Sequence, residues 1–336
     1  MKRASTAVFV LTAACCAQIV LAQATSTEPV LSLSKGSGQG YPSKPIRLIV
    51  PFPPGGGSDL IARVSAQKLA AIIGQQIVVD NRPGAGGTVG VETGMKAPAD
   101  GYTLTLIAAS YTVNPSLYKL PFDPVNDITP VIQLSQGPFL LAVHPSLPVA
   151  TVKELIALAR ARPNQLSYAS SGTGSGVHLA TELFLERAGI RVLGIPYKGT
   201  GPALNDTVAG HVQMLWGSVA STLPQVKGGR LRGIAVSTAR RIRAAPDIPT
   251  VMESGFKDYD VVLWHGLIAP KGLPQPIVIR INTDLNNALR EKDMEDRLAM
   301  DGVAPAGGTP AQFLTEIRKG IDMWRGVVRR LGLKAE

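Results

Sequence analysis

Two glycine-rich corners contain the residue types that could bind an anion through the main chain alone. The first corner, residues 52–58, reads FPPGGGS, and the second corner, residues 170–175, reads SSGTGS. Each lies between an apolar run that predicts a strand and an amphipathic run that predicts a helix. The first-turn amides of a helix lack partners, the helix dipole favours negative charge there, and glycine lets a ligand approach the backbone closely. Both corners are therefore predicted to donate hydrogen bonds to a small carboxylate.

The candidate ligand-binding residues lie in these corners or directly after a predicted strand. Ser58 or Asp59 is expected to cap the first helix. Ser110 follows a strand at the carboxyl edge where α/β sheets place ligands, and Tyr197 could line the site and offer a hydroxyl. The alternatives are tight connections at the corners and an ordinary loop hydroxyl at Ser110. The candidates are Phe52, Pro54, Gly55, Gly56, Gly57, Ser58, Ser110, Ser170, Ser171, Gly172, Thr173, Gly174, Ser175 and Tyr197.

Motifs for catalysis, nucleotides or metals fit the sequence poorly. It contains no GxxxxGK[ST] loop, and residues 172–177 lack the third glycine of the dinucleotide fingerprint. Neither Ser58 nor Ser175 lies in a GxSxG elbow. The four histidines lack metal-ligand spacing and are expected to be structural, with His178 having the best functional claim. We expect no catalytic residue, no metal and no cofactor; an exported hydrolase or transferase is the alternative.

The N-terminal residues predict export. Residues 1–24 contain two basic residues, an apolar stretch and an A-x-A cleavage motif, which together indicate a signal peptide. The two cysteines of the sequence, Cys15 and Cys16, lie inside it, so the mature chain is expected to have none. Lipid attachment to either cysteine is the less favoured alternative, because no aliphatic residue stands three positions before Cys15.

The charge balance is basic. Removing the signal peptide takes Lys+Arg from 34 to 32 with 24 acidic residues unchanged, so the net charge falls from +10 to +8. This excess is consistent with an anionic ligand, although a solvated basic surface is an equal explanation. Nucleic acid is not expected as a partner, because the basic residues are scattered and aromatic residues make up only 5% of the chain.

Apolar and amphipathic runs alternate along the rest of the chain. This alternation predicts an α/β protein with largely parallel sheets. Capping boxes are predicted at Thr151 and Thr309, and the last three helices are expected to pack against the first domain. The predicted strands are 46–50, 77–79, 103–108, 139–143, 166–169, 192–195, 212–216, 234–236 and 261–269. The predicted helices are 59–73, 151–161, 177–188, 202–209, 220–227, 276–290, 294–300 and 311–330.

Several ordered blocks of the sequence resemble the Bug family, the periplasmic solute receptors of tripartite tricarboxylate transporters. The blocks are YPSKPIRLIVPFPPGGGSD at 41–59, DNRPGAGG at 80–87, PADGY at 98–102, NPSLY at 114–118, GTGSGVHL at 172–179, PYKG at 196–199 and WHGLIAP at 264–270. The resemblance covers nearly the whole chain after the signal peptide.

The resemblance implies a class II periplasmic binding protein, with two α/β lobes around a hinged ligand cleft. The implied ligand is a small carboxylate: a di- or tricarboxylate, an acidic amino acid or an aromatic acid. The two corners would hold its carboxylate, partly through water, and the receptor would present it to membrane permease subunits. Lobe 1 is then predicted at 44–144 plus 265–336 and lobe 2 at 145–264, after a linker at 25–43. A receptor that signals to a sensor protein is a further alternative.

Overall fold

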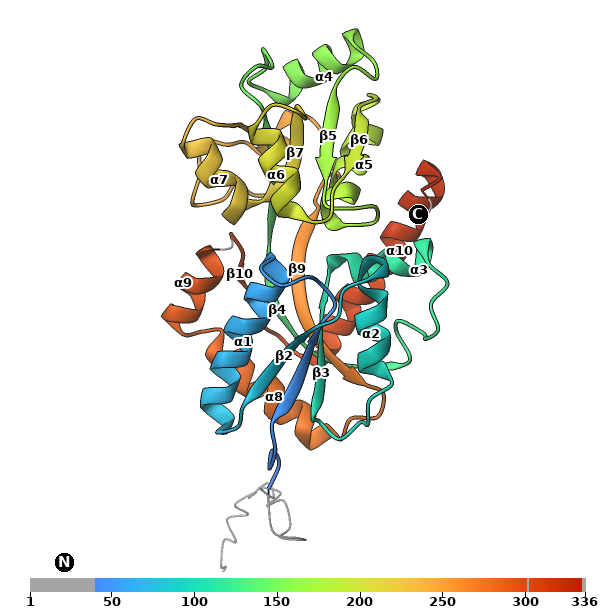
Figure 1. The fold of residues 1–336 in the computed structure, drawn as a ribbon, viewed down its shortest axis with the longest axis vertical. Coiled ribbons are helices and arrows are strands. Elements are labelled where there is room, and N and C mark those ends of the chain that lie inside the picture. The colour runs from blue at the N-terminus through green and yellow to red at the C-terminus, as the bar shows by residue number, and fades with distance from the viewer. Residues whose placement is uncertain (1–39, 301, 334–336) are drawn as a thin grey trace, which may run out of the picture. The chain divides into compact units, whose positions relative to one another are not determined.

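The computed structural model describes residues 40–300 and 302–333 (Figure 1). The predicted signal peptide and most of the predicted linker lie outside the described residues. From Tyr41 onward the chain forms one compact unit. No helix among the described residues is both long enough and apolar enough to cross a membrane.

Ten strands form the sheet of this unit, in the order β2-β1-β3-β9-β4-β7-β5-β6, with β8 and β10 also pairing with β4. β1 is parallel to β2 and β3, and β5 is parallel to β6 and β7, whereas β4 and β9 run antiparallel to their neighbours. The predicted α/β class is confirmed. The strands are β1 Ile46–Val50, β2 Ile77–Asn81, β3 Thr103–Ala108, β4 Ile128–Val143, β5 Ser167–Ser170, β6 Leu193–Pro196, β7 Met214–Ser218, β8 Arg232–Val236, β9 Val262–Pro270 and β10 Ala304–Pro305.

The long strand β4 belongs to two half-sheets. Its residues 128–138 pair with β9 and β10 in the first half-sheet, which also contains β1 to β3. Its residues 139–143 pair with β7 and β8 in the second half-sheet, which also contains β5 and β6. Figure 1 shows β4 and β9 running between the two groups of elements.

The sequence prediction found only the last five residues of β4. Pro130, Gly137 and Pro138 interrupt the apolar pattern of the missed part, and such residues normally indicate turns. Shifts of register between Pro130 and Ile132 and between Gln133 and Ser135 accommodate the irregular stretch within the strand.

Helices cover both half-sheets. Both predicted capping boxes are present, at Thr151 with Glu154 and at Thr309 with Gln312. The helices are α1 Gly57–Ile73, α2 Thr88–Met95, α3 Asn114–Leu117, α4 Val152–Ala161, α5 Gly176–Ala188, α6 Thr200–Val208, α7 Val219–Lys227, α8 Gln275–Ala288, α9 Lys292–Met300 and α10 Pro310–Leu331. The short 3-10 helices are η1 Ala85–Gly87, η2 Ala109–Thr112 and η3 Met252–Ser254.

Helix α2 was not predicted, because its two glycines weaken the helical pattern. In the structure, both glycines lie where a side chain would clash with a neighbouring segment. A Cβ at Gly94 would lie 1.9 Å from Oγ1 of Thr105 on β3, and a Cβ at Gly90 would lie 2.6 Å from Pro51. The glycines therefore let α2 pack directly against the strands that lead into the candidate site.

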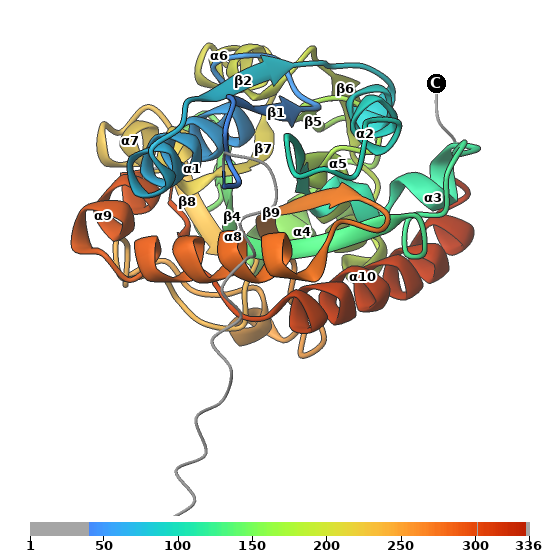
Figure 2. The ribbon, with the colours of Figure 1, turned by 90° about the horizontal axis from the view of Figure 1, so that it is seen from below.

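The last helix, α10, packs against both half-sheets rather than the first alone. Phe313 and Ile317 join a core cluster with Ile107 and Ile268 of the first half-sheet. Trp324, further along the helix, joins a cluster that includes many side chains around the second half-sheet. Figure 2 shows α10 running along one side of the unit beside β4 and β9. The helix thus braces the two strands that connect the half-sheets.

Gly266 on β9 lies where the core leaves no room for a side chain. A Cβ there would be 2.2 Å from the Phe313 ring and 2.8 Å from the carbonyl oxygen of Ile132. We expect Gly266→Ala to lower the free energy of unfolding by about 1–3 kcal/mol, because overpacking forces neighbouring atoms to shift. Urea denaturation followed by circular dichroism measures the change.

The matched control is Gly326→Ala on α10, where the new Cβ would meet only the flexible end of Arg330, at 3.4 Å. This variant should keep or gain stability, since alanine favours a helix over glycine. An equal loss in both variants would show that local crowding at β9 is not the cause.

Candidate functional site

The first corner folds as an exposed turn between β1 and α1. Helix α1 begins at Gly57 with Gly56 as its N-cap, and no side chain caps it. The expected cap by Ser58 or Asp59 is therefore wrong. Pro54, Gly55, Gly56 and Gly57 are exposed, and Gly55 adopts a φ of 81°, which favours glycine. The first-turn amides have no acceptor within the helix, so this corner offers donors to solvent or to a ligand.

Asp59 braces the first corner instead of capping it. Its Oδ2 accepts hydrogen bonds from the Gly55 amide at 3.0 Å and from Nε of Arg63 at 2.9 Å, and its Oδ1 accepts from Nδ2 of Asn81 at 2.9 Å. Asn81 also donates to the carbonyl oxygen of Phe52 at 3.1 Å. The two side chains therefore hold both ends of the corner, a role that sequence reasoning did not assign to either.

The environment of Asp59 keeps it ionised. Its side chain is buried, with the residue 4% exposed. Burial raises the pKa of Asp59, but the hydrogen bonds from Arg63, the Gly55 amide and Asn81 together hold it below its ordinary value. The Arg63 guanidinium offsets the negative charge, which would otherwise repel an anion at the corner.

Ser58 is half-buried and points toward the long strands. Its Oγ lies 3.1 Å from Nε2 of His265 on β9, and Nδ1 of the same ring lies 3.0 Å from Oγ of Ser135 on β4. His265 is 1% exposed, and burial lowers its pKa to about 4, so the ring is neutral at ordinary pH. His265 was expected to be structural, and its ring lies directly against the candidate residue Ser58.

The second corner connects β5 to α5 and is more enclosed than the first. Ser170 and Gly174 are buried, and Ser171, Gly172 and Thr173 are half-buried. Gly172 and Gly174 have φ values of 111° and 76°, so the turn itself requires glycine at both positions.

The end of the second corner organises the start of α5. Ser175 is its N-cap, with Oγ accepting from the His178 amide at 3.2 Å, and Nδ1 of the His178 ring accepts from the Gly174 amide at 3.2 Å. One hydroxyl and one ring are therefore already engaged in shaping this corner.

Tyr197 lies beside the second corner through its backbone. Its amide donates to the carbonyl oxygen of Ser170 at 2.9 Å, and a Cβ on Gly172 would approach the Tyr197 carbonyl oxygen to 3.5 Å. Its hydroxyl, however, donates to Oδ2 of Asp206 at 2.7 Å, and burial together with this bond raises the pKa of Tyr197 to about 12. The proton that it was expected to offer a ligand is committed to Asp206.

Phe52 and Ser110 line one small recess together with Gly87 and Asn114. Its volume of about 10 Å³ leaves room for about one water molecule. Asn114 is 3% exposed and donates from Nδ2 to the Gly86 carbonyl oxygen at 3.0 Å, while its Oδ1 has no hydrogen-bond partner among the described residues. Sequence reasoning missed Asn114 as a site residue, although it opens the NPSLY block.

The structure therefore brings the candidates together in two groups. Phe52 to Ser58 and Ser110 belong to the first half-sheet, and Ser170 to Ser175 and Tyr197 belong to the second. The groups approach each other at α3, because a Cβ on Gly174 would lie 2.7 Å from Cδ1 of Leu117. Leu117 comes a few residues after Ser110 in the chain.

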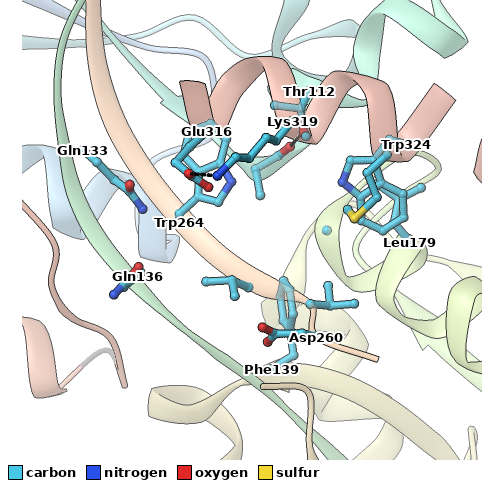
Figure 3. A pocket seen from close by; sticks show the side chains of 16 residues that line it. Thr112, Gln133, Gln136, Phe139, Leu179, Asp260, Trp264, Glu316, Lys319 and Trp324 are labelled. Atoms are coloured by element: carbon cyan, nitrogen blue, oxygen red, sulfur yellow. Dashed lines mark hydrogen bonds and ion pairs between the residues drawn. The ribbon is translucent and has the colours of Figure 1, made fainter. Parts of the chain in front are cut away.

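A larger cavity of about 490 Å³ lies elsewhere, between β4, β9, α5 and α10 (Figure 3). Its walls include Phe139, Trp264 and Trp324, with the Glu316–Lys319 ion pair (2.9 Å) on α10. None of the predicted ligand-binding residues lines this cavity.

Comparison with known proteins places the chain in a family. Residues 61–333 match the family described as "Tripartite tricarboxylate transporter family receptor". The chain belongs to this family. BugT of Bordetella pertussis is 38% identical over 301 residues, which cover 89% of this chain and 92% of BugT. A protein of R. palustris solved with adipate is 35% identical, with a TM-score of 0.82 over 88% of this chain and 99% of that one. MatC of Rhodopseudomonas palustris, solved with bound malate, is 30% identical, with a TM-score of 0.79 over 86% and 100%.

Membership of this family confirms the resemblance to the Bug family that the sequence blocks indicated. The solved structures also confirm the predicted fold of a periplasmic binding protein. The molecule is therefore a periplasmic solute-binding receptor. Two of the blocks, at 41–59 and 172–179, contain residues of the corners, and the DNRPGAGG block supplies Asn81, which holds the first corner.

The brace at the first corner of the receptor gives a stability prediction. Asp59→Asn should lower the free energy of unfolding at pH 7 by about 1–3 kcal/mol, because three donors lose a charged, buried acceptor. Since the folded pKa of Asp59 lies below its ordinary value near 3.8, the stabilisation is present above that value and is lost as pH falls through the folded pKa. Urea denaturation of both proteins between pH 7 and pH 3 should show the difference between them shrinking.

Asp258→Asn is the control, because that carboxylate is 84% exposed and lies 3.9 Å from its partner Arg187. It should change stability by less than about 0.5 kcal/mol at either pH. A similar pH-dependent loss for both substitutions would contradict a special role for Asp59.

Proposed function

We propose that this receptor binds a small carboxylate between its two corners. The observation that carries the proposal is the uncapped, exposed first turn of α1, whose loop is held in shape by Asp59 and Asn81 while its amides stay available. Main-chain amides at a helix N-terminus suit a carboxylate oxygen, and they need no cationic side chain.

The ligand class has support from relatives. The proteins solved with adipate and with bound malate share more than a quarter of their residues with this chain and superpose over most of its length. Both of those ligands are dicarboxylates. For this receptor we propose a di- or tricarboxylate, an acidic amino acid or an aromatic acid, with specificity set by side chains around the corners rather than by the shared amides.

The larger cavity is a poorer place for such a ligand. Its acidic side chains are Asp260 and Glu316, and its basic side chain, Lys319, is already paired with Glu316. Aromatic walls and a net negative charge disfavour a small anion, because a buried charge needs partners. The electrostatics of the described residues therefore favour the corners over the cavity.

Binding should draw the two half-sheets together over the ligand. They are joined by β4 and β9, and they already approach each other where Leu117 meets Gly174. We propose lobe 1 at 44–144 plus 265–336 and lobe 2 at 145–264, with α10 packed across both. A hinge motion of this kind is common in periplasmic binding proteins.

The receptor would be exported through the signal peptide at residues 1–24 and would present its ligand to permease subunits of a tripartite tricarboxylate transporter. We propose a binding function without catalysis. In support of this, the Ser175 hydroxyl serves as a helix cap and Nδ1 of His178 accepts from a main-chain amide. The second candidate is a signalling receptor, which would report its ligand-bound state to a sensor protein through the same closed surface.

Substitution of Gly56 tests the amide site. Gly56 has ordinary extended φ and ψ, and a Cβ there would meet only the Pro53 carbonyl oxygen, at 3.9 Å, so Gly56→Val should fold. The branched side chain would cover the first-turn amides. Adipate and malate are the first probes, followed by tricarboxylates, acidic amino acids and aromatic acids. The wild type should gain thermal stability with at least one of them, and the variant should lose most of that gain.

The control Gly326→Val places the same side chain on α10, against the flexible end of Arg330. It should bind like the wild type. Gly174→Val is unsuitable, because its φ of 76° and the contact with Leu117 would disturb the fold itself. A full ligand-induced shift in Gly56→Val would refute the amide site.

A further inference from the structure

His265 connects a candidate ligand-binding hydroxyl to the interior of the sheet. The ring is fully enclosed and bridges two serines that belong to different elements: Ser58 in the first turn of α1 and Ser135 on β4. No other hydrogen bond of either serine hydroxyl occurs among the described residues. The three side chains therefore form a continuous chain of two hydrogen bonds that ends at Ser58 in the first corner.

Hydrogen-bond satisfaction sets the direction of this chain. A neutral imidazole has one donor and one acceptor nitrogen, and the low pKa of the buried ring supports the neutral form. Ser135 is 0% exposed, and its hydroxyl proton finds an acceptor only at Nδ1 of His265. If Nδ1 carried the proton instead, the Ser135 hydroxyl would be a buried donor without a partner, which is costly.

The proton on the ring must then lie on Nε2. Nε2–H donates to Oγ of Ser58, so the Ser58 hydroxyl acts as an acceptor toward the ring and has to direct its own proton elsewhere. Ser58 is half-buried rather than enclosed, so its remaining hydrogen-bonding side is open to solvent or to a ligand. It lies in the same turn as the free amides of the first corner.

We propose that His265 is a positioning residue that directs the hydroxyl proton of Ser58 away from the ring and toward an oxygen of the ligand. The order is Ser135 O–H to Nδ1, Nε2–H to Ser58 Oγ, and Ser58 O–H to a carboxylate oxygen. This inference rests on the proposed carboxylate site and specifies its chemistry. A serine hydroxyl on its own can donate to the ring or accept from it; with Nε2–H donating to Ser58, the hydroxyl proton is left for an oxygen lone pair of the ligand.

The ring tautomer is the first test, and it needs no ligand. Long-range proton–nitrogen correlation spectra of ¹⁵N-labelled wild-type receptor at pH 7 should show His265 with a protonated Nε2 and an unprotonated Nδ1. The His265→Gln spectrum, which lacks this signal, assigns it among the four histidines. A protonated Nδ1 would overturn the proposal, because the chain would then run in the opposite direction.

Binding of adipate and malate by calorimetry tests the effect on the ligand. Ser58→Ala should weaken binding of the better of the two by about tenfold, since a hydrogen bond to a charged group is lost. His265→Phe, which removes both ring partners, should weaken it by a similar factor or less. The double variant should bind no worse than Ser58→Ala alone, because the histidine acts through the serine. Additive losses would instead indicate a merely structural role and would refute the coupling.

The conservative variant His265→Gln provides a rescue control. Its amide offers an acceptor to Ser135 and a donor to Ser58, so it should retain more affinity than His265→Phe. Equal affinity of these two variants would contradict a role for the donated hydrogen bond. If the wild type binds neither these probes nor the wider panel of acids, the proposed function fails; if it binds and Ser58→Ala binds equally well, only this inference fails.

Discussion

The structure depends on one constraint of the α-helix, namely that its first-turn amides have no partner within the helix. The chain meets this constraint differently at different helices. At α4 and α10, capping boxes supply side-chain acceptors, and at α5 the hydroxyl of Ser175 does so. At α1 the N-cap is a glycine without a side chain, and the corner before it is exposed. The first corner is thus the more open of the two candidate anion sites, whereas the second is shaped by its own cap.

Holding such a corner open requires support from residues that do not fill it. Asp59 could have capped α1 and would then have occupied the anion position itself. Its carboxylate instead accepts hydrogen bonds from the Gly55 amide and from Asn81, and the Arg63 guanidinium offsets its charge. The Asp59 carboxylate therefore holds the conformation of the corner, and the adjacent Arg63 guanidinium reduces the electric field of its charge there. This arrangement keeps three consecutive glycines in one conformation, although glycine has the greatest freedom in the unfolded chain.

The parts of the site that could be predicted from the sequence are those with local signals. The two corners, the alternation of strands and helices and the two capping boxes all depend on residues close together in the chain. Residues 128–138 of β4 and helix α2 could not be predicted, because prolines and glycines needed for close packing also resemble turn signals. His265 gave no local signal either, since Ser135 and Ser58 lie 130 and 207 residues away from it. The brace by Asn81 and the recess at Asn114 likewise depend on contacts between distant segments.

The two strands that connect the half-sheets also lie against the first corner. His265 and Ser135 lie on β9 and β4, the two strands that pair with each other along most of the connection. Ser58 lies on α1, which packs against the same first half-sheet. A hydrogen bond between Ser58 and His265 therefore depends on how the connecting strands sit against α1. A single neutral ring thus ties the first turn of α1 to both β9 and β4.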